Sequence, residues 1–520
     1  MHKYTIICQL FYSPYLAYFL YFMSNLSYRQ QKIQDHRQQK SFREFLLEIG
    51  TWMSLGFTKQ NGFFTKYEIP ERLPNMVSIH EFNHSRDNLV DIYAVSDTTS
   101  GFFEAFRKLW AITPQAPVID HGGNESSTFA DCVMMSKNCY LSNVVINECE
   151  DILYSNIVIQ NNKSIINANF VVDNCSNIFQ SSYVVNSFNV FYSKLIINSS
   201  DIRFCVNCSG CHSCLMCYDL QNQSYCIENK QYTKEAFDLK KQELVAKKDT
   251  FDQLYSKLDT SKCTISSDQS QGNFIAFSNH ITDRYFIDRI NKKKNLIYMN
   301  NPDKIEDIIN CFDAKVHSNN IYAIRWCDVD SQFCYCSVHL ERCTSVYYSY
   351  NMISCSFCIG CIWLRNKFYY ILNKQYTKED QKQKTNKIFW QMERDDTLGS
   401  FFPASLCPYY FNDTAAYLID NSFTKEEVIA KGYLRRDEVI KIDIPADAEI
   451  MLSTNLNQFE SFDSEGNRTI SADILKKVIQ DESWNTYRII PMEYKFLMKH
   501  ALPLPRKHRL ERMKENFRIK

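Results

Sequence analysis

The run CVNCSGCHSCLMC places a cysteine at every third position from Cys205 to Cys217. Thiolates with this spacing can share one tetrahedral zinc ion at about 2.3 Å, and iron–sulfur clusters use the same spacing. A second run repeats three of these positions, so the candidate metal ligands are Cys211, Cys214, Cys217, Cys355, Cys358 and Cys361. Free cysteine also behaves as a small buried hydrophobic residue. We therefore expect thiols that pack the core without a cofactor, with bound zinc as the alternative.

Composition sets the class of protein. The 520 residues carry zero net charge, so the overall charge does not predict a nucleic-acid or membrane partner. Disulfide frameworks belong to small secreted domains, so the 21 cysteines of this long chain are expected to be reduced in a cytoplasmic protein. The uncharged stretch 4–28 leaves alternatives open: a membrane anchor or signal through residues 4–22, or a misplaced start with Met23 as the true first residue.

An aliphatic residue recurs every six or seven positions through the middle of the chain, and a small residue follows three positions after each. The aliphatic positions are Ile152, Val158, Ile165, Val171, Ile178, Val184, Val190, Ile196 and Ile202. The small positions are Ser155, Asn161, Ala168, Asn174, Ser181, Ser187, Ser193, Ser199 and Cys205. A helix needs a spacing of 3.6 and a simple strand alternates at 2, so this period indicates short strands joined by tight corners. It is typical of a parallel β-solenoid, in which like side chains stack from coil to coil.

The cysteine runs continue this period, with thiols in both the aliphatic and the small positions. Residues 208–235 align with residues 352–379, and both copies end in NKQYTKE. The sequence therefore predicts two solenoid lobes that end in the same terminator. The shared polar residues are also candidates for partner contact: Asn229, Lys230, Gln231, Tyr232, Asn373, Lys374, Gln375 and Tyr376.

A helix is expected after each terminator, because Thr233 and Thr377 are good N-caps and acidic residues follow them. Thr424 and Glu427 form a capping box before a third, short helix. The fold class is thus mainly β, a parallel β-solenoid in two lobes with helical caps and a mixed α+β tail. The expected segments are 1–28 (uncharged), 29–130 (helical or mixed), 131–232 (first lobe), 233–310 (cap and linker, including a loop at 291–295), 311–376 (second lobe), 377–400 (cap) and 401–520 (mixed C-terminal region).

Two further patterns point to chemistry. Hexapeptide-repeat acyltransferases are solenoids that use a histidine as general base, and the histidines near the repeats are His212, His317 and His339. The stretch 491–520 is rich in Lys and Arg with interleaved aromatics, which is typical of phosphate contact. Its candidate contact residues for nucleic acid are Arg506, Lys507, Arg509 and Arg512. A solvated terminus is the other interpretation of this stretch.

The chain resembles an uncharacterised group of cysteine-rich repeat proteins of candidate-phyla bacteria and their phages. The resemblance rests on FFEAFRKL (102–109), SKNCYLSN (136–143), the cysteine runs, LRNKFYYILNKQYTKE (364–379), TKEEVIAKGY (424–433) and YRIIPMEYKFLMKHALPLPRKH (487–508). It implies no established activity. Relatives often carry terminal zinc ribbons, whose core is matched here by Tyr487, Ile489, Glu493, Phe496 and Leu502–Pro505. The flanking cysteines are missing, which puts a terminal zinc ribbon in doubt.

We therefore expect a non-enzymatic binding or scaffold protein whose stacked faces meet an unknown macromolecule. No small-molecule substrate is evident, and the oligomeric state is left open. The alternatives are a hexapeptide-type acyltransferase, a structural zinc or iron–sulfur metalloprotein, and a nucleic-acid or ribosome-associated protein that binds through its basic C-terminus.

Overall fold

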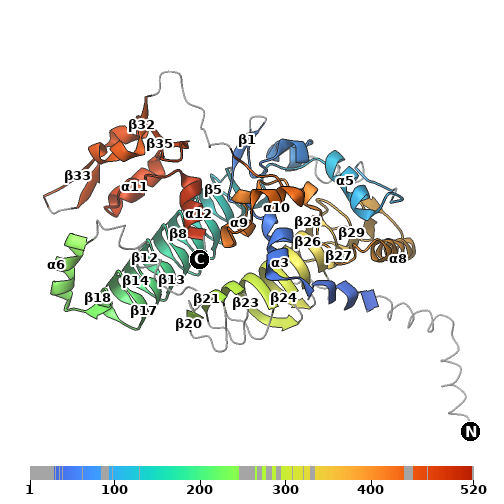
Figure 1. Cartoon of the computed structure of the whole chain (residues 1–520), viewed down its shortest axis with the longest axis horizontal. Coiled ribbons are helices and arrows are strands. Elements are labelled where there is room, and N and C mark those ends of the chain that lie inside the picture. Colours follow the sequence, from blue (N-terminus) through green and yellow to red (C-terminus); the bar gives the residue numbers. More distant parts are fainter. Residues whose placement is uncertain are drawn as a thin grey trace, which may run out of the picture.

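Two stacks of short parallel strands form the body of the molecule, a β-solenoid of about 13 turns over residues 129–371 (Figure 1). The fold comes from a computed structural model. It describes residues 28–244 and 334–517, except 30, 34, 38, 61–62, 84–92, 97, 128, 438–448 and 465–466, together with six strands between 264 and 327. The expectation of an anchor or signal at 4–28 falls almost wholly outside these residues. Within them, no helix has both the length and the apolar character needed to cross a bilayer.

The first solenoid has two strands in each coil, so its strands form two faces. It begins with β3 (Asp120–Gly122), β4 (Phe129–Met134) and β5 (Lys137–Ile146). The even-numbered face consists of β6 (Glu150–Leu153), β8 (Lys163–Ile166), β10 (Ser176–Phe179), β12 (Phe188–Phe191), β14 (Ser200–Arg203), β16 (His212–Leu215) and β18 (Ser224–Ile227). The odd-numbered face consists of β7 (Asn156–Ile159), β9 (Asn169–Val172), β11 (Ser182–Val185), β13 (Lys194–Ile197), β15 (Val206–Ser209) and β17 (Tyr218–Gln221).

A coil takes 13 residues in the first part of this solenoid and 12 in the rest. Lys163 pairs with Ser176, and Ser176 pairs in turn with Phe188. Each 13-residue coil has one additional residue at one of its corners. The residue whose side chain points into the solenoid therefore lies one position later in the sequence. Asn162 and Cys175 are therefore buried there, whereas the expected Asn161 and Asn174 are exposed at the corner. The other predicted aliphatic and small positions of the repeat are buried as expected.

The backbone of the solenoid enters the left-handed region at every third residue. Over the three successive strands β10, β11 and β12 and the corners between them, φ is positive at Asn177, Gln180, Tyr183, Asn186 and Asn189, with values between 45° and 55°. Asparagine tolerates this conformation better than most residues, because its short side chain can form local hydrogen bonds. The abundance of asparagine in a chain with few glycines therefore has a structural use.

The second solenoid is longer than the sequence pattern predicts. Its strands are β20 (Thr264–Ile265), β21 (Gly272–Ala276), β22 (Arg284–Asp288), β23 (Lys294–Glu306), β24 (Ile309–Asn319), β25 (Ile321–Cys327), β26 (Cys334–Glu341), β27 (Thr344–Tyr347), β28 (Tyr350–Ile353), β29 (Ser356–Ile359) and β30 (Tyr370–Ile371). Segment 263–310, expected to be a linker, thus supplies four strands, and residues 294–295 of the expected loop start β23. The six-residue repeat is weak there, so it gave no signal before 311.

Both predicted helical caps follow their solenoids. Helix α6 (Lys234–Leu244) and helix α8 (Lys378–Arg394) begin after Thr233 and Thr377, whose hydroxyls accept from the backbone N–H of Ala236 and Asp380. The first helix was expected to extend to about residue 258, but residues 245–258 lie outside the described part. Helix α10 (Lys425–Ala430) is capped by Thr424 as predicted, although the Glu427 carboxylate binds Arg43 instead of the cap.

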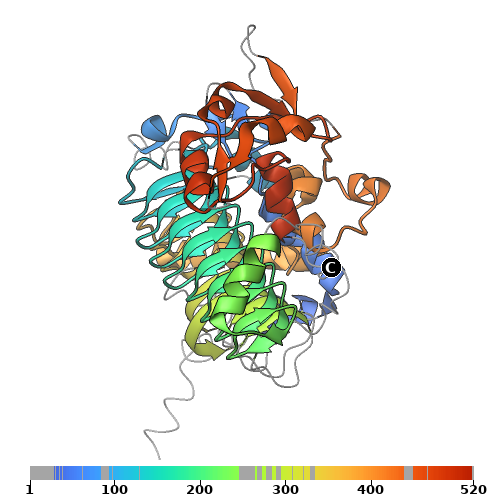
Figure 2. The same cartoon turned by 90° about the vertical axis from the view of Figure 1, so that its left-hand side faces the viewer.

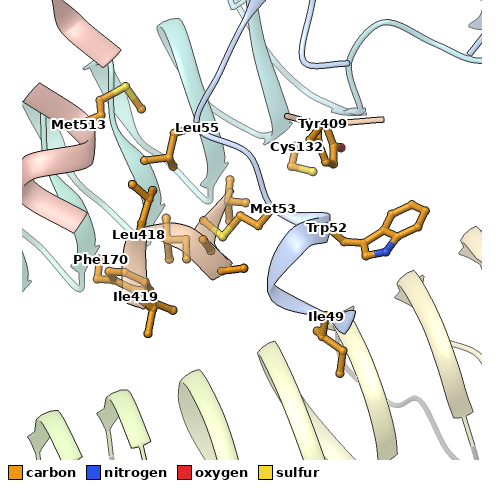
Figure 3. Close-up of a cluster of buried hydrophobic side chains, with 14 of the residues drawn as sticks. Ile49, Trp52, Met53, Leu55, Cys132, Phe170, Tyr409, Leu418, Ile419 and Met513 are labelled. Atoms are coloured by element: carbon orange, nitrogen blue, oxygen red, sulfur yellow. The ribbon is translucent and has the colours of Figure 1, made fainter. Parts of the chain in front are cut away.

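An N-terminal region fills the space between the two solenoids (Figure 3). Its elements are α3 (Phe42–Glu48), η1 (Gly50–Trp52), β1 (Thr58–Gln60), β2 (Phe63–Thr65), η2 (Pro70–Arg72) and α5 (Phe102–Ile112). Trp52 packs against Tyr350 of the second solenoid, with ring centroids 6.0 Å apart. In the same cluster Met53 and Leu55 lie near Phe170 of the first solenoid, together with Leu418 from α9 (Ala415–Ile419). One continuous core therefore joins both solenoids.

The first part of the C-terminal region packs on the N-terminal region through η4 (Ala404–Leu406) and η5 (Phe411–Asp413), where the Leu55 N–H donates to the Asp413 carbonyl. The later part lies on the first solenoid in both views (Figures 1 and 2). It contains β32 (Ile450–Leu452), η6 (Ser453–Phe459), β33 (Glu460–Phe462), β34 (Arg468–Ile470), η7 (Ala472–Lys476), β35 (Val478–Gln480), β36 (Thr486–Tyr487), α11 (Pro491–Lys499) and α12 (Arg509–Phe517). Helix α11 covers the even-numbered face, where Phe496 stacks on Phe179 at 5.9 Å. Helix α12 covers the odd-numbered face, where Asn169 donates to the Met513 carbonyl at 3.2 Å.

A buried carboxylate makes stability depend on pH. Burial, with the neighbouring Asp413 carboxylate, raises the pKa of Glu68 from 4.5 to about 8. The folded chain then holds a proton that the unfolded chain releases, so stability falls as pH rises through this window. The melting temperature of the transition that contains Glu68 should fall as the pH rises from about 6.5 to 8, and Glu68→Gln should flatten this dependence. Burial lowers the pKa of His508, so this residue affects stability only below about pH 6.5. There the unfolded chain binds a proton that the folded chain does not, and stability falls as the pH is lowered. An equal slope in both proteins would contradict the assignment to Glu68.

Candidate functional site

The cysteines of the first run line the interior of the solenoid, where Cys205, Cys211 and Cys217 take the positions of serines and Cys208 and Cys214 those of aliphatic residues. In the small position, Ser193 donates to the Phe191 carbonyl and accepts from the Cys205 N–H one coil later. Cys205 repeats both contacts: its Sγ donates to the Arg203 carbonyl at 3.2 Å and accepts from the Cys217 N–H at 3.4 Å. The thiol therefore extends a hydrogen-bond ladder that the serine hydroxyls begin.

All six candidate metal ligands are buried, and those of the second run lie in the second solenoid. Every cysteine whose side chain the structure describes is a thiol outside any disulfide. Over the same part of the chain, no three His, Cys, Asp or Glu side chains are placed to hold a metal ion. Burial raises the pKa of Cys343 to about 12, whereas a hydrogen bond from Cys208, with a second from Cys214, lowers the pKa of Cys211. Zinc binding by these cysteines stays a prediction.

Serine should replace these thiols without loss of the fold. Cys211 donates to the Ser209 carbonyl and Cys355 to the Ile353 carbonyl, as the interior serines do to theirs. We expect Cys211→Ser/Cys355→Ser to shift the melting temperature by only a few degrees, whereas Cys211→Val should cost about 1–3 kcal/mol through lost hydrogen bonds. Elemental analysis of the reduced protein tests the alternative at the same time. One equivalent or more of zinc or iron, lost in the double serine variant, would make the runs metal sites.

The two terminators end their solenoids with the same pair of asparagine hydrogen bonds. Asn229 accepts from the Tyr218 N–H at 2.9 Å and donates to the Tyr218 carbonyl at 2.8 Å. Asn373 makes the same pair of bonds with Ile362, at 2.8 and 3.1 Å. Each asparagine thus takes the place of the next coil. Strands β19 (Lys230–Gln231) and β31 (Lys374–Gln375) then run antiparallel to the last strand, which ends the parallel stack.

The remaining terminator residues lie at the surface. Lys230, Gln231, Lys374 and Gln375 are exposed, and Tyr232 and Tyr376 are half-buried. Lys240 lies over the Tyr232 ring at 4.4 Å and Lys384 over the Tyr376 ring at 5.2 Å, so each tyrosine ties the terminator to its helix. A role in partner contact is left to the lysines and glutamines.

The basic C-terminus is largely occupied by contacts within the chain. Arg512 is 3% exposed and pairs with Glu493 at 2.8 Å. Arg509 lies over the Tyr154 ring of the solenoid at 5.6 Å, and Lys507 pairs with Glu515. Arg506 is exposed and donates to Asn457. A nucleic-acid contact through this stretch would therefore depend on Arg506 and Lys507, because α12 turns the other two residues onto the solenoid.

The two predicted histidines whose side chains the structure describes, His212 and His339, lie on different solenoids. The Nδ1 atom of His212 lies 2.6 Å from Ser200 Oγ and 3.7 Å from Asp201 Oδ2, on the half-exposed surface of the even-numbered face. His339 is buried, with Nδ1 3.8 Å from Cys132 Sγ. The backbone of His317 belongs to β24, but its side chain lies outside the described part. The acyltransferase alternative, with a histidine as general base, stays a prediction.

Sequence reasoning missed a ladder of amides on the surface of the first solenoid. Two short chains of hydrogen-bonded side chains make up what we call the asparagine edge: Asn177, Asn189 and Asp201 on the even-numbered strands, and Asn186 and Asn198 at the corner that precedes these strands. Asn177 donates to Asn189 at 2.9 Å, Asn189 donates to Asp201 at 2.8 Å, and Asn186 donates to Asn198 at 2.8 Å. Strands in a sheet are about 4.8 Å apart, so the edge presents amides at a regular spacing. The signal was the recurrence of asparagine at the left-handed positions.

Comparison with protein-family models, with curated proteins and with solved structures finds no match. The resemblance to cysteine-rich repeat proteins therefore stays a prediction, and the function must be argued from the fold and its surfaces.

Proposed function

We propose that the chain is a non-enzymatic binding or scaffold protein that presents the asparagine edge to a macromolecular partner. The observation that supports it is the ladder of hydrogen-bonded amides, exposed or half-buried, on the stacked coils. Each amide is held in place by its neighbour and by the stacked backbone. A partner therefore meets a rigid surface and loses little conformational freedom from the scaffold when it binds.

Several other surfaces of the first solenoid are covered. Its C-terminal end is closed by β19 and α6, so addition of a strand from a partner is blocked there. Helix α12 covers the odd-numbered face at β9, β11 and β13, and α11 packs on the apolar part of the even-numbered face. The asparagine edge is left open as a regular surface over three neighbouring coils, on which a partner can lie.

The test uses a photo-crosslinking residue at position 198 in the full-length chain. We expect one dominant adduct, and the partner identified from it should bind the purified chain directly. The double variant Asn189→Lys/Asn198→Arg should weaken that binding at least tenfold, because it breaks the ladder and adds bulk and charge. The matched control Asn467→Arg changes an exposed asparagine of the C-terminal region and should leave the affinity unchanged.

Two results would refute the proposal. One is a partner that binds both variants equally well, which would place its contact elsewhere on the chain. The other is the lack of any adduct at position 198 when the same probe at Lys230 captures a partner, which would favour the terminator surface.

A further inference from the structure

A cavity of about 890 Å³ lies between the even-numbered face of the first solenoid and the C-terminal region. Tyr192, Arg203 and Phe204 line it from the solenoid, and Arg468 and the segment Leu502–Arg506 line it from the other side. Sites for small molecules usually measure about 300–1,000 Å³ and occur preferentially where two parts of a structure meet. The cavity therefore has the size and place of a ligand site.

Arg203 interrupts an otherwise apolar column beside this cavity. The register stacks one residue from each strand of the even-numbered face: Leu153, Ile166, Phe179, Phe191, Arg203, Leu215 and Ile227. The six apolar members are at most 3% exposed. Burial lowers the pKa of Arg203, and the side chain is half-buried, so this position carries a partly desolvated cation where the fold favours a leucine. A residue that works against stability in this way is expected where function requires it.

The Arg203 guanidinium has few protein partners. Its Nη2 donates to the His500 carbonyl at 3.4 Å, and the group lies over the Phe191 ring at 4.8 Å. No carboxylate in the described chain comes within ion-pair distance of it. The other arginines named in the cavity wall differ, because the half-buried Arg468 pairs with Glu460 at 2.6 Å and the buried Arg512 with Glu493 at 2.8 Å. Most of the five N–H donors of Arg203 are therefore left for a ligand.

The hydroxyl of Tyr192 adds a second donor. The side chain is 7% exposed and stacks on Phe204 at 5.0 Å, which fixes its position in the wall. Its hydroxyl makes no hydrogen bond to any residue that the structure describes. Burial raises the pKa of Tyr192, so the group stays protonated and can donate.

We propose that this cavity binds a small organic anion, whose phosphate or carboxylate group is held by the Arg203 guanidinium and the Tyr192 hydroxyl. Arginine binds either group through two parallel hydrogen bonds, which gives both affinity and orientation. The remainder of the ligand lies against Phe204 and the segment Leu502–Pro505. The site is separate from the asparagine edge and does not depend on the proposed scaffold role.

Isothermal titration calorimetry of the full chain tests the proposal with phenyl phosphate, benzoate and benzylamine as probes. We expect phenyl phosphate or benzoate to bind, and the stronger of the two identifies the anionic group. Benzylamine, a cation of similar shape, should not bind. Arg203→Leu should weaken binding at least tenfold and Tyr192→Phe about fivefold, because each removes donors from the anion. Lys163→Leu, which removes an exposed cation of the same face, should bind as the unaltered chain does.

The Arg203→Leu variant also tests whether arginine at this position is kept for ligand binding and not for stability. Since Phe191 and Leu215 flank it, leucine should fit the column, and the melting temperature without ligand should not fall. If neither anion binds at millimolar concentration, or if both Arg203→Leu and Tyr192→Phe bind as tightly as the unaltered chain, the proposal is refuted. If Arg203→Leu does not fold, Tyr192→Phe alone decides.

Discussion

Replacing Arg512 with methionine should destabilise the attachment of α12 to the first solenoid by about 3–5 kcal/mol. Arg512 and Glu493 form an ion pair with side chains 3% and 0% exposed, and the pair joins α12 to α11. Removing the arginine leaves a carboxylate buried without a counter-charge, which is the costly way to break such a pair. Hydrogen exchange of peptides from α11 and α12 measures the effect locally, because a chain of this size need not unfold in one step.

The double variant Glu493→Leu/Arg512→Met is the control for this prediction. It removes both charges together, so it should recover at least half of the stability lost in the single variant. A single variant with unchanged exchange protection would contradict the prediction. The result also separates two interpretations of the basic C-terminus. If Arg512 served mainly to contact nucleic acid, its loss would weaken that binding without changing the protection of α12.

Much of the fold was predictable because one physical rule repeats along the chain. A residue that points into a narrow solenoid must be apolar or small, so the period of six identifies the strands from Ile152 to Ile202 and explains the cysteine run. The terminators were predictable for the same reason: NKQY occurs twice because two stacks of strands must end. The N-caps at Thr233 and Thr377 followed from local hydrogen bonding.

Other features depend on contacts that no local pattern shows. The strands between residues 264 and 310 pair in parallel although their sequence carries no clear repeat, because neighbouring coils supply the register. The two-residue corner that buries Asn162 instead of Asn161 depends on coil length, which a spacing of seven does not locate. Arg512 looked like a surface cation in the sequence, and only the packing of α12 on the solenoid buries it. Arg203 looked ordinary until the register placed it in an apolar column.

Replacing Asn373 with alanine should destabilise the end of the second solenoid by about 2–4 kcal/mol. Asn373 is 1% exposed, and its side chain satisfies both the N–H and the carbonyl of Ile362. Alanine would leave these two backbone groups buried and unpaired, each at the cost of a lost hydrogen bond. Alanine is also less suited than asparagine to the φ of +61° at this position. Hydrogen exchange of peptides from β28 to β31 measures the loss.

Two further variants separate these causes and test whether burial sets the size of the effect. Asn373→Gly accepts the left-handed backbone, so the difference between Gly and Ala isolates the conformational part, expected at about 1 kcal/mol. Asn229→Ala removes the same two hydrogen bonds from the first solenoid, but Asn229 is exposed and water can replace them. Its loss should therefore be smaller than that of Asn373→Ala. Equal losses at the two sites would mean that the asparagine acts through its backbone conformation, and that the hydrogen bonds to the last coil contribute little.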